Sequence, residues 1–217
     1  MRRLRPYAAN TGSELRWREI TPPTSGVPRL NLRELWDYRD LAFILAKREL
    51  QLTYRQTLLG VAWVVLQPLV GTIVFSVVFG QLAQLPSDGV PYAAFVLTGL
   101  TVWMFVSGAV SSAADSLVHD RDLVTKVYFP RLLAPLGAVL ACTVELFITL
   151  MLLIPVLAIT RVVPPLQVIT VPLWMLAAVL LAVAVGLWLA ASNVLYRDVQ
   201  YLLGFLLQIW LFVSPVA

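Results

Sequence analysis

The sequence predicts an all-α protein that crosses a membrane several times, and three observations support this fold class. Of the 217 residues, 59% are hydrophobic and only 13% are charged, whereas soluble domains carry about 25% charged residues. The mean hydropathy is +0.82. Five apolar runs approach or exceed the ~20 residues that a helix needs to cross a bilayer. We expect a flexible cytosolic tail (1–30), an amphipathic helix (31–57) and a transmembrane domain (58–217).

The N-terminal part is polar up to residue 30 and then becomes amphipathic. Its basic start is not followed by an apolar run, so it does not resemble a secretory signal peptide. Asn31 and Glu34 have the spacing of a capping box, which predicts a helix start. The helix mixes apolar and basic residues and directly precedes an apolar run, so it is typical of a helix that lies in the membrane interface. An ordinary soluble helix is the alternative.

The apolar runs predict five transmembrane helices, and their boundaries follow from the charged or proline-containing loops between them. Pro68 is expected to break the first one, and Gly60 and Gly71 are expected to allow close helix approach. Because the chain ends inside an apolar run, we expect at least one further segment, and six spans in the complete chain. The five runs are residues 58–80, 92–112, 133–159, 166–191 and 199–217.

Basic residues are distributed unevenly between the loops. Eleven of the sixteen lysines and arginines precede the first span, and with a cytosolic N-terminus all except Arg161 lie on the cytosolic side. An excess of lysine and arginine marks the cytosolic side of membrane proteins. The sequence therefore predicts a multi-pass protein with a cytosolic N-terminus that contacts anionic lipids.

The composition also excludes several kinds of chemistry. Because the chain has one histidine and one cysteine, His119 and Cys142, it lacks the parts of the usual zinc sites and His-dependent catalytic sites. No P-loop motif is present, so ATP hydrolysis through such a loop is not expected on this chain. A membrane glycosyltransferase would need acidic residues near the outer face, and only Asp88 is available there. We therefore expect neither catalytic residues, metal, nor cofactor.

The segment VTKVYFPRLLAPLG, residues 124–137, lies in the loop between the second and third spans. It predicts a short helix from Leu117 to Tyr128 that Pro130 terminates. Apolar and aromatic side chains flanked by basic ones are typical of a protein–protein contact. An aromatic belt resting on the membrane surface explains the same composition equally well. The residues concerned are Leu123, Lys126, Val127, Tyr128, Phe129 and Arg131.

Four separated motifs resemble the ABC-2 type permeases that export polysaccharides such as O-antigen, capsule and teichoic acid. They are LNLRELWDYRDL (30–41), RQTLLGVAWVVLQPL (55–69), KVYFPR (126–131), which SLV (116–118) precedes, and NVLYRDV (193–199), with SPV (214–216) near the end. The resemblance implies a homodimer in the bacterial inner membrane, with a role in lipopolysaccharide biosynthesis. It also implies two separate ATPase subunits that hold ATP and Mg²⁺, and no nucleic-acid partner.

The same resemblance assigns the loop residues around Val127 to a coupling helix that sits in a cleft of the ATPase. Aromatic anchors would fill the cleft, and Lys126 and Arg131 would set the orientation. Tyr196, Arg197 and Asp198 would form a smaller second contact. A stop signal followed by a helix cap explains these three residues equally well.

The implied substrate is a lipid-linked polysaccharide with a diphosphate between lipid and sugar. Cations just before the first span, Lys47, Arg48 and Arg55, would bind this headgroup, although each alone also suits anchoring to anionic lipids. Channel-lining candidates are Trp63, Gln67, Tyr92 and Trp103. The aromatic ones among them also suit the membrane interface.

Glu145 is the only carboxylate well inside a predicted span. Such acids face the interior of a bundle and mark either function or a pairing partner. We favour a hydrogen-bonded packing residue, with Thr143 and Thr149 as partners within reach. The alternatives for the whole chain are a proton-coupled secondary transporter that uses Glu145, and an ABC-2 exporter of another lipid or drug cargo.

Overall fold

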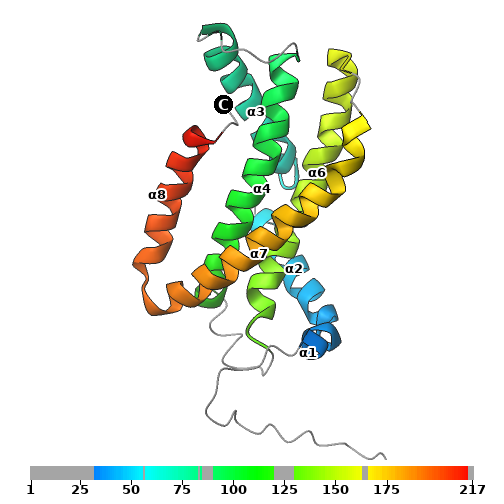
Figure 1. The fold of residues 1–217 in the computed structure, drawn as a ribbon. Helices are drawn as coiled ribbons and strands as arrows, with labels where there is room; N and C mark the ends of the chain where they lie inside the picture. The colour runs from blue at the N-terminus through cyan, green and yellow to red at the C-terminus, as the bar shows by residue number, and fades with distance from the viewer. Residues whose placement is uncertain are drawn as a thin grey trace, which may run out of the picture. The chain divides into compact units, whose positions relative to one another are not determined.

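The computed structural model describes residues 32–55, 57–82, 84, 90–119, 130–162 and 166–214. Within these ranges the elements are helices and no strand occurs, as the sequence predicts. Apart from Leu32, the described residues belong to one compact unit, residues 33–217. Its core lies where α4 (Tyr92–His119) contacts α6 (Leu133–Thr160) and α7 (Val171–Leu195), as Figure 1 shows.

Four described helical segments are long and apolar enough to cross a membrane. Two are single helices, α4 and α6, and two are composite: α3 (Ala62–Phe75) continues as the π-helix η1 (Ser76–Leu82), and the 3₁₀-helix η2 (Leu166–Thr170) leads into α7. The fifth predicted run forms α8 (Asp198–Val213). Its 16 residues correspond to ~24 Å, less than the ~30 Å hydrocarbon core.

The first span differs from its prediction at both ends and at Pro68. The helix begins at Ala62 rather than residue 58, because Gly60 takes the left-handed conformation (φ 53°) in the turn before it. The break expected at Pro68 is wrong, since α3 continues through this residue. Proline lacks the N–H that would bond the carbonyl four residues earlier, that of Val64, and membrane helices tolerate such a missing bond. The irregular part instead begins at Ser76.

The two glycines of this region also serve different purposes. A Cβ built on Gly71 would lie 3.1 Å from Leu100 Cδ1, which confirms a close approach between α3 and α4. No described atom lies within 4 Å of a Cβ built on Gly60. Gly60 therefore serves the turn, where its positive φ favours glycine.

The second span continues further than predicted. The boundary at residue 112 and the separate loop helix from Leu117 are wrong for residues 113–119, which extend α4 without interruption. Ala113 and Ala114 are fully buried, so the packing of α4 against its neighbours carries the helix beyond the apolar run. The remainder of the predicted loop helix lies outside the described residues.

The predicted amphipathic helix is interrupted at Tyr38, which separates α1 (Leu32–Asp37) from α2 (Arg39–Tyr54). The Tyr38 carbonyl accepts hydrogen bonds from the next turn. Asn31, its predicted N-cap, lies outside the described residues. A Cβ built on Gly137 would lie 2.9 Å from Leu45 Cβ, so α2 packs closely along α6.

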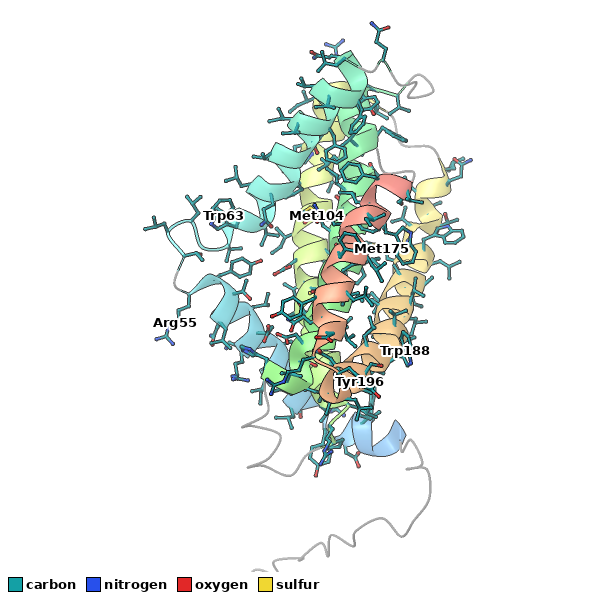
Figure 2. The ribbon with its side chains drawn as sticks, turned by 90° about the vertical axis from the view of Figure 1, so that its left-hand side faces the viewer. Arg55, Trp63, Met104, Met175, Trp188 and Tyr196 are labelled. Atoms are coloured by element: carbon teal, nitrogen blue, oxygen red, sulfur yellow. The ribbon has the colours of Figure 1, made fainter. Side chains whose placement is uncertain are left out.

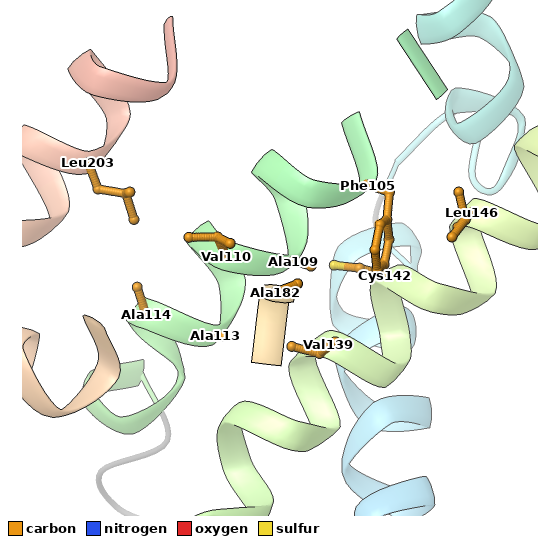
Figure 3. Packing of buried hydrophobic residues seen from close by; sticks show 10 residues of the cluster. All are labelled: Phe105, Ala109, Val110, Ala113, Ala114, Val139, Cys142, Leu146, Ala182 and Leu203. Atoms are coloured by element: carbon orange, nitrogen blue, oxygen red, sulfur yellow. The ribbon is translucent and has the colours of Figure 1, made fainter. Parts of the chain in front are cut away.

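Small residues form the seam between α4 and α7. Ala109, Ala113 and Ala182, which Figure 3 labels, are fully buried there. A Cβ built on Gly186 would lie 2.6 Å from Ala113 Cβ, which leaves no room for a side chain. Close backbone approach at small residues is the usual way in which membrane helices associate. This seam therefore holds α4 and α7 at a defined distance.

Candidate functional site

A pocket of about 580 Å³ lies where α2 ends and the chain turns into α3, with α6 as its opposite wall. We call it the α2–α6 pocket. Its polar groups belong to Lys47, Gln51, Tyr54, Arg55 and Glu145. The remaining lining is apolar except for Gly60 and comes from Leu50, Val61, Val64, Val144 and Ile148.

The helical repeat of α2 brings the polar side chains of this pocket together. Lys47, Gln51 and Tyr54 follow one another at intervals of four and three residues, so they lie on one face of the helix. Arg55 comes directly after the helix and points outward from the same side of the unit as Trp63 (Figure 2). The α2 face and the turn at Gly60 therefore place two cations at one pocket.

Tyr54 connects α2 to the transmembrane helix α6. Its hydroxyl donates a hydrogen bond to Glu145 Oε1 at 2.5 Å. Burial, and then this hydrogen bond, raise the pKa of the Tyr54 phenol well above its ordinary value. The phenol therefore remains a neutral donor throughout the physiological pH range.

This bond corrects the predicted partners of Glu145. Thr143 and Thr149 instead donate to backbone carbonyls of their own helix, those of Val139 and Glu145. Threonine in a helix commonly bonds the carbonyl four residues earlier, so neither hydroxyl reaches the carboxylate. Tyr54 was not among the predicted site residues, although it lies seven residues after Lys47, on the same face of the predicted helix.

A second cavity, of about 170 Å³, adjoins the α2–α6 pocket on the side of the bundle interior. Tyr54, Val64 and Glu145 line both spaces. The inner cavity adds Gln67 and Thr101, among others. The Tyr54–Glu145 hydrogen bond therefore lies between a cation-lined pocket and a smaller space inside the bundle.

The structure brings together only some of the predicted substrate residues. Lys47 and Arg55 share the α2–α6 pocket, whereas Arg48 is exposed on α2 and does not line it. Of the channel candidates, Gln67 lines the inner cavity and Trp63 is 39% exposed nearby.

Tyr92 and Trp103, the other two channel candidates, lie elsewhere. The Tyr92 ring covers Gly80, whose built Cβ would lie 2.9 Å from its Cδ1. Trp103 lines an apolar groove of about 620 Å³ between α4, α7 and α8, together with Trp188 and Trp210. The four candidates therefore do not line one common space.

The predicted ATPase contacts are only partly described. Leu123, Lys126, Val127, Tyr128 and Phe129 lie outside the described residues. Arg131, Tyr196, Arg197 and Asp198 are exposed. A polar pocket of about 230 Å³ joins His119 of α4, Ala134 of α6 and Gln200 of α8, so these segments meet at the same end of the bundle.

Two substitutions separate the charge of Glu145 from its hydrogen bond. Tyr54→Phe removes the donor and should lower the free energy of unfolding by about 1 kcal/mol, because the half-buried carboxylate loses its partner. Glu145→Gln keeps an acceptor for Tyr54 and should leave transport nearly intact. Thermal unfolding in detergent and transport by whole cells measure the two effects. A Glu145→Gln protein that assembles normally but does not transport would instead identify Glu145 as a proton site.

Apolar spanning helices with a cation-lined pocket beside them are features of a membrane transport protein. Comparison with known proteins refines this class. The chain belongs to the ABC-2 type transporter family, which it matches over residues 40–217.

Curated relatives carry one shared description. The chain is 32% identical over 185 residues to the O-antigen export system permease protein RfbA of Myxococcus xanthus, covering 85% of this chain and 70% of the relative. It is 22% identical over 180 residues to a protein of the same description from Klebsiella pneumoniae, covering 82% of this chain and 68% of the relative.

Proposed function

We propose that this chain is the permease subunit of an ATP-driven exporter that moves a lipid-linked, O-antigen-like polysaccharide from the cytosolic to the outer side of the bacterial inner membrane. Membership of the ABC-2 family and the description of its relatives support the transport of a polysaccharide. The observation that carries the proposal is the α2–α6 pocket, which combines two cationic side chains with apolar walls.

The chemistry of this pocket suits the region where lipid, diphosphate and first sugar meet. Arg55 offers a planar fork of donors for phosphate oxygens, and Lys47 adds a second positive charge. The apolar wall, which includes Val61 and Ile148, suits the hydrocarbon part of the carrier. Gln51 offers hydrogen-bonding groups to sugar hydroxyls.

The energy source in this proposal is a separate ATPase subunit that binds ATP and Mg²⁺. Two permease copies and two ATPase copies form the exporter. The loop that contains Tyr128 and Phe129, and the turn at Tyr196, contact the ATPase on the cytosolic side. The loop charge distribution supports this orientation and a cytosolic N-terminus.

The main alternative is a proton-coupled transporter that uses Glu145. The hydrogen bond from Tyr54 favours a packing role for this carboxylate instead. An ABC-2 exporter of another lipid or drug cargo has the same architecture and differs in its cargo, so only a transport assay separates it from the proposal.

The test is purification of the full-length permease from its own cells in mild detergent. We expect an ATPase subunit to co-purify, and ATP hydrolysis by the complex to rise on addition of lipid-linked polysaccharide. The absence of an ATPase would contradict the proposal. Stimulation by other lipids alone would favour the other cargo.

Removing the pocket cations should weaken the response to substrate. Charge removal at Lys47, Arg48 and Arg55 together should raise the concentration of lipid-linked polysaccharide that half-stimulates ATP hydrolysis. The double variant Lys47→Gln/Arg55→Gln should account for most of this rise, by about a hundredfold, since each of the two lost charge-assisted hydrogen bonds costs ~1.5 kcal/mol, or about tenfold.

Arg48→Gln is the matched control, because it removes a charge from the same helix without changing the pocket lining. An equal loss in the control would assign all three cations to lipid anchoring. Hydrolysis is measured in proteoliposomes of constant lipid composition, so that anchoring and substrate binding are not confused.

A further inference from the structure

The two helices α4 and α7 run side by side in the same direction. Thr98 and Val102, in the first half of α4, share a cavity with Val171 and Trp174, in the first turn of α7. Near their last turns, Ala114 of α4 contacts Asn193 of α7. Beyond these last turns lie the two segments to which the proposed function assigns ATPase contact.

Asn193 makes a side-chain hydrogen bond to the neighbouring helix α4 at this end of the seam. Its side chain is 1% exposed and lies two residues before the end of α7, at Leu195. Its Nδ2 donates a hydrogen bond to the backbone carbonyl of Ala114 at 3.0 Å. The hydroxyl of the neighbouring residue Ser192 instead bonds the Trp188 carbonyl of its own helix.

A bond of this kind defines the register between the two helices. Sliding α7 along α4 would leave a buried amide without its acceptor, which is unfavourable wherever water is absent. The small-residue seam beside it sets the distance between the helices but opposes sliding less, because alanine and glycine present a smooth surface. Figure 3 labels three alanines of this seam, Ala109, Ala113 and Ala182.

We propose that Asn193 is a positioning residue that locks the ends of α4 and α7 together, so that the two ATPase-contacting segments move as one unit. This inference rests on the proposed function. A force that the ATPase exerts on either segment is then transmitted to both α4 and α7. Packed elements change between discrete arrangements rather than by continuous sliding, and one shared bond makes that change common to both helices.

The lock itself is tested on the purified permease without any partner. Spin labels are placed at Val118 and Leu195, both of which are exposed, in a protein whose Cys142 is replaced by alanine. We expect a narrow distribution of label distances, and at least a twofold broader one in Asn193→Leu. Ser192→Ala, next to it, should leave the distribution narrow. An unchanged distribution in Asn193→Leu would show that packing alone holds the helices, and would overturn the lock.

The consequence for transport is tested in the complete exporter. Asn193→Leu should still co-purify with the ATPase and hydrolyse ATP, while the amount of polysaccharide exported per ATP hydrolysed falls about tenfold. Asn193→Asp, which keeps the size but lacks the amide donor, should behave similarly if the leucine variant does not fold. A normal export ratio in a folded variant overturns the inference.

A distinct result identifies failure of the proposed function. If no ATPase co-purifies with the unaltered chain, the proposed function is wrong, and the role of Asn193 in coupling to an ATPase is then wrong as well. The label distances in the isolated permease still decide whether Asn193 joins the two helices.

Discussion

Replacing Tyr128 and Phe129 together by alanine should release the ATPase subunit from the exporter while the transmembrane helices stay folded. Both residues lie outside the described part of the chain, so the expectation rests on the aromatic and basic composition of their loop. Aromatic anchors at the centre of an interface typically contribute ~2 kcal/mol or more each, so the pair should weaken binding by about three orders of magnitude. Co-purification of the ATPase measures the loss.

The control for this change is Phe205→Ala/Phe212→Ala on α8, which removes two exposed rings that lie seven and fourteen residues after Asp198, the end of the second predicted contact. This variant should retain the ATPase. Thermal unfolding of both variants without the partner shows whether the helices are intact. Retention of the ATPase by the Tyr128/Phe129 variant would mean that these rings rest on the membrane surface as an aromatic belt.

Gly186→Val should destabilise the bundle more than any other single change considered for the α4–α7 seam. Even the first added carbon would lie 2.6 Å from Ala113 Cβ, far inside contact distance. The helices cannot separate locally without opening the seam at Ala182 and Ala190, both fully buried on the same side of α7. Overpacking of this kind costs ~1–3 kcal/mol, and a lower unfolding temperature in detergent would report it.

Gly204→Val is the matched control, because Gly204 lies in α8 and no described atom is within 4 Å of a Cβ built on it. The same substitution should change the unfolding temperature little there. If Gly186→Val unfolded at the temperature of the unaltered protein, the close approach of α4 and α7 would not be a feature of the folded bundle.

The spanning helices were predictable because the membrane imposes a local rule. A segment that crosses a bilayer needs ~20 apolar residues, and this requirement can be read from any stretch of the chain without knowing its neighbours. Four of the five predicted spans are confirmed as helices of sufficient length, and the fifth is the shorter α8. The family could also be recognised, because its motifs are short and continuous.

The boundaries were predicted less well because packing and backbone conformation decide them. Pro68 is a strong breaker by local rules, yet α3 continues through it. The polar residues after Ser112 suggest a loop, yet α4 continues to His119 because its alanines are buried against neighbouring helices. At Pro68 the helix tolerates one missing hydrogen bond, and after Ser112 tertiary packing outweighs the local preference of the chain.

The sequence by itself determined the class of protein, the cations before the first span and the acid inside the third. Only the tertiary structure decided which partners these residues contact. Tyr54 and Glu145 are 91 residues apart, and Asn193 and Ala114 are 79 apart. Hydropathy measures how well a single residue suits the membrane interior. A hydrogen bond between two helices depends instead on the distance, rotation and register of the two helices. Those three quantities follow from packing at Gly137 and Gly186, where the absence of a side chain lets the helices approach.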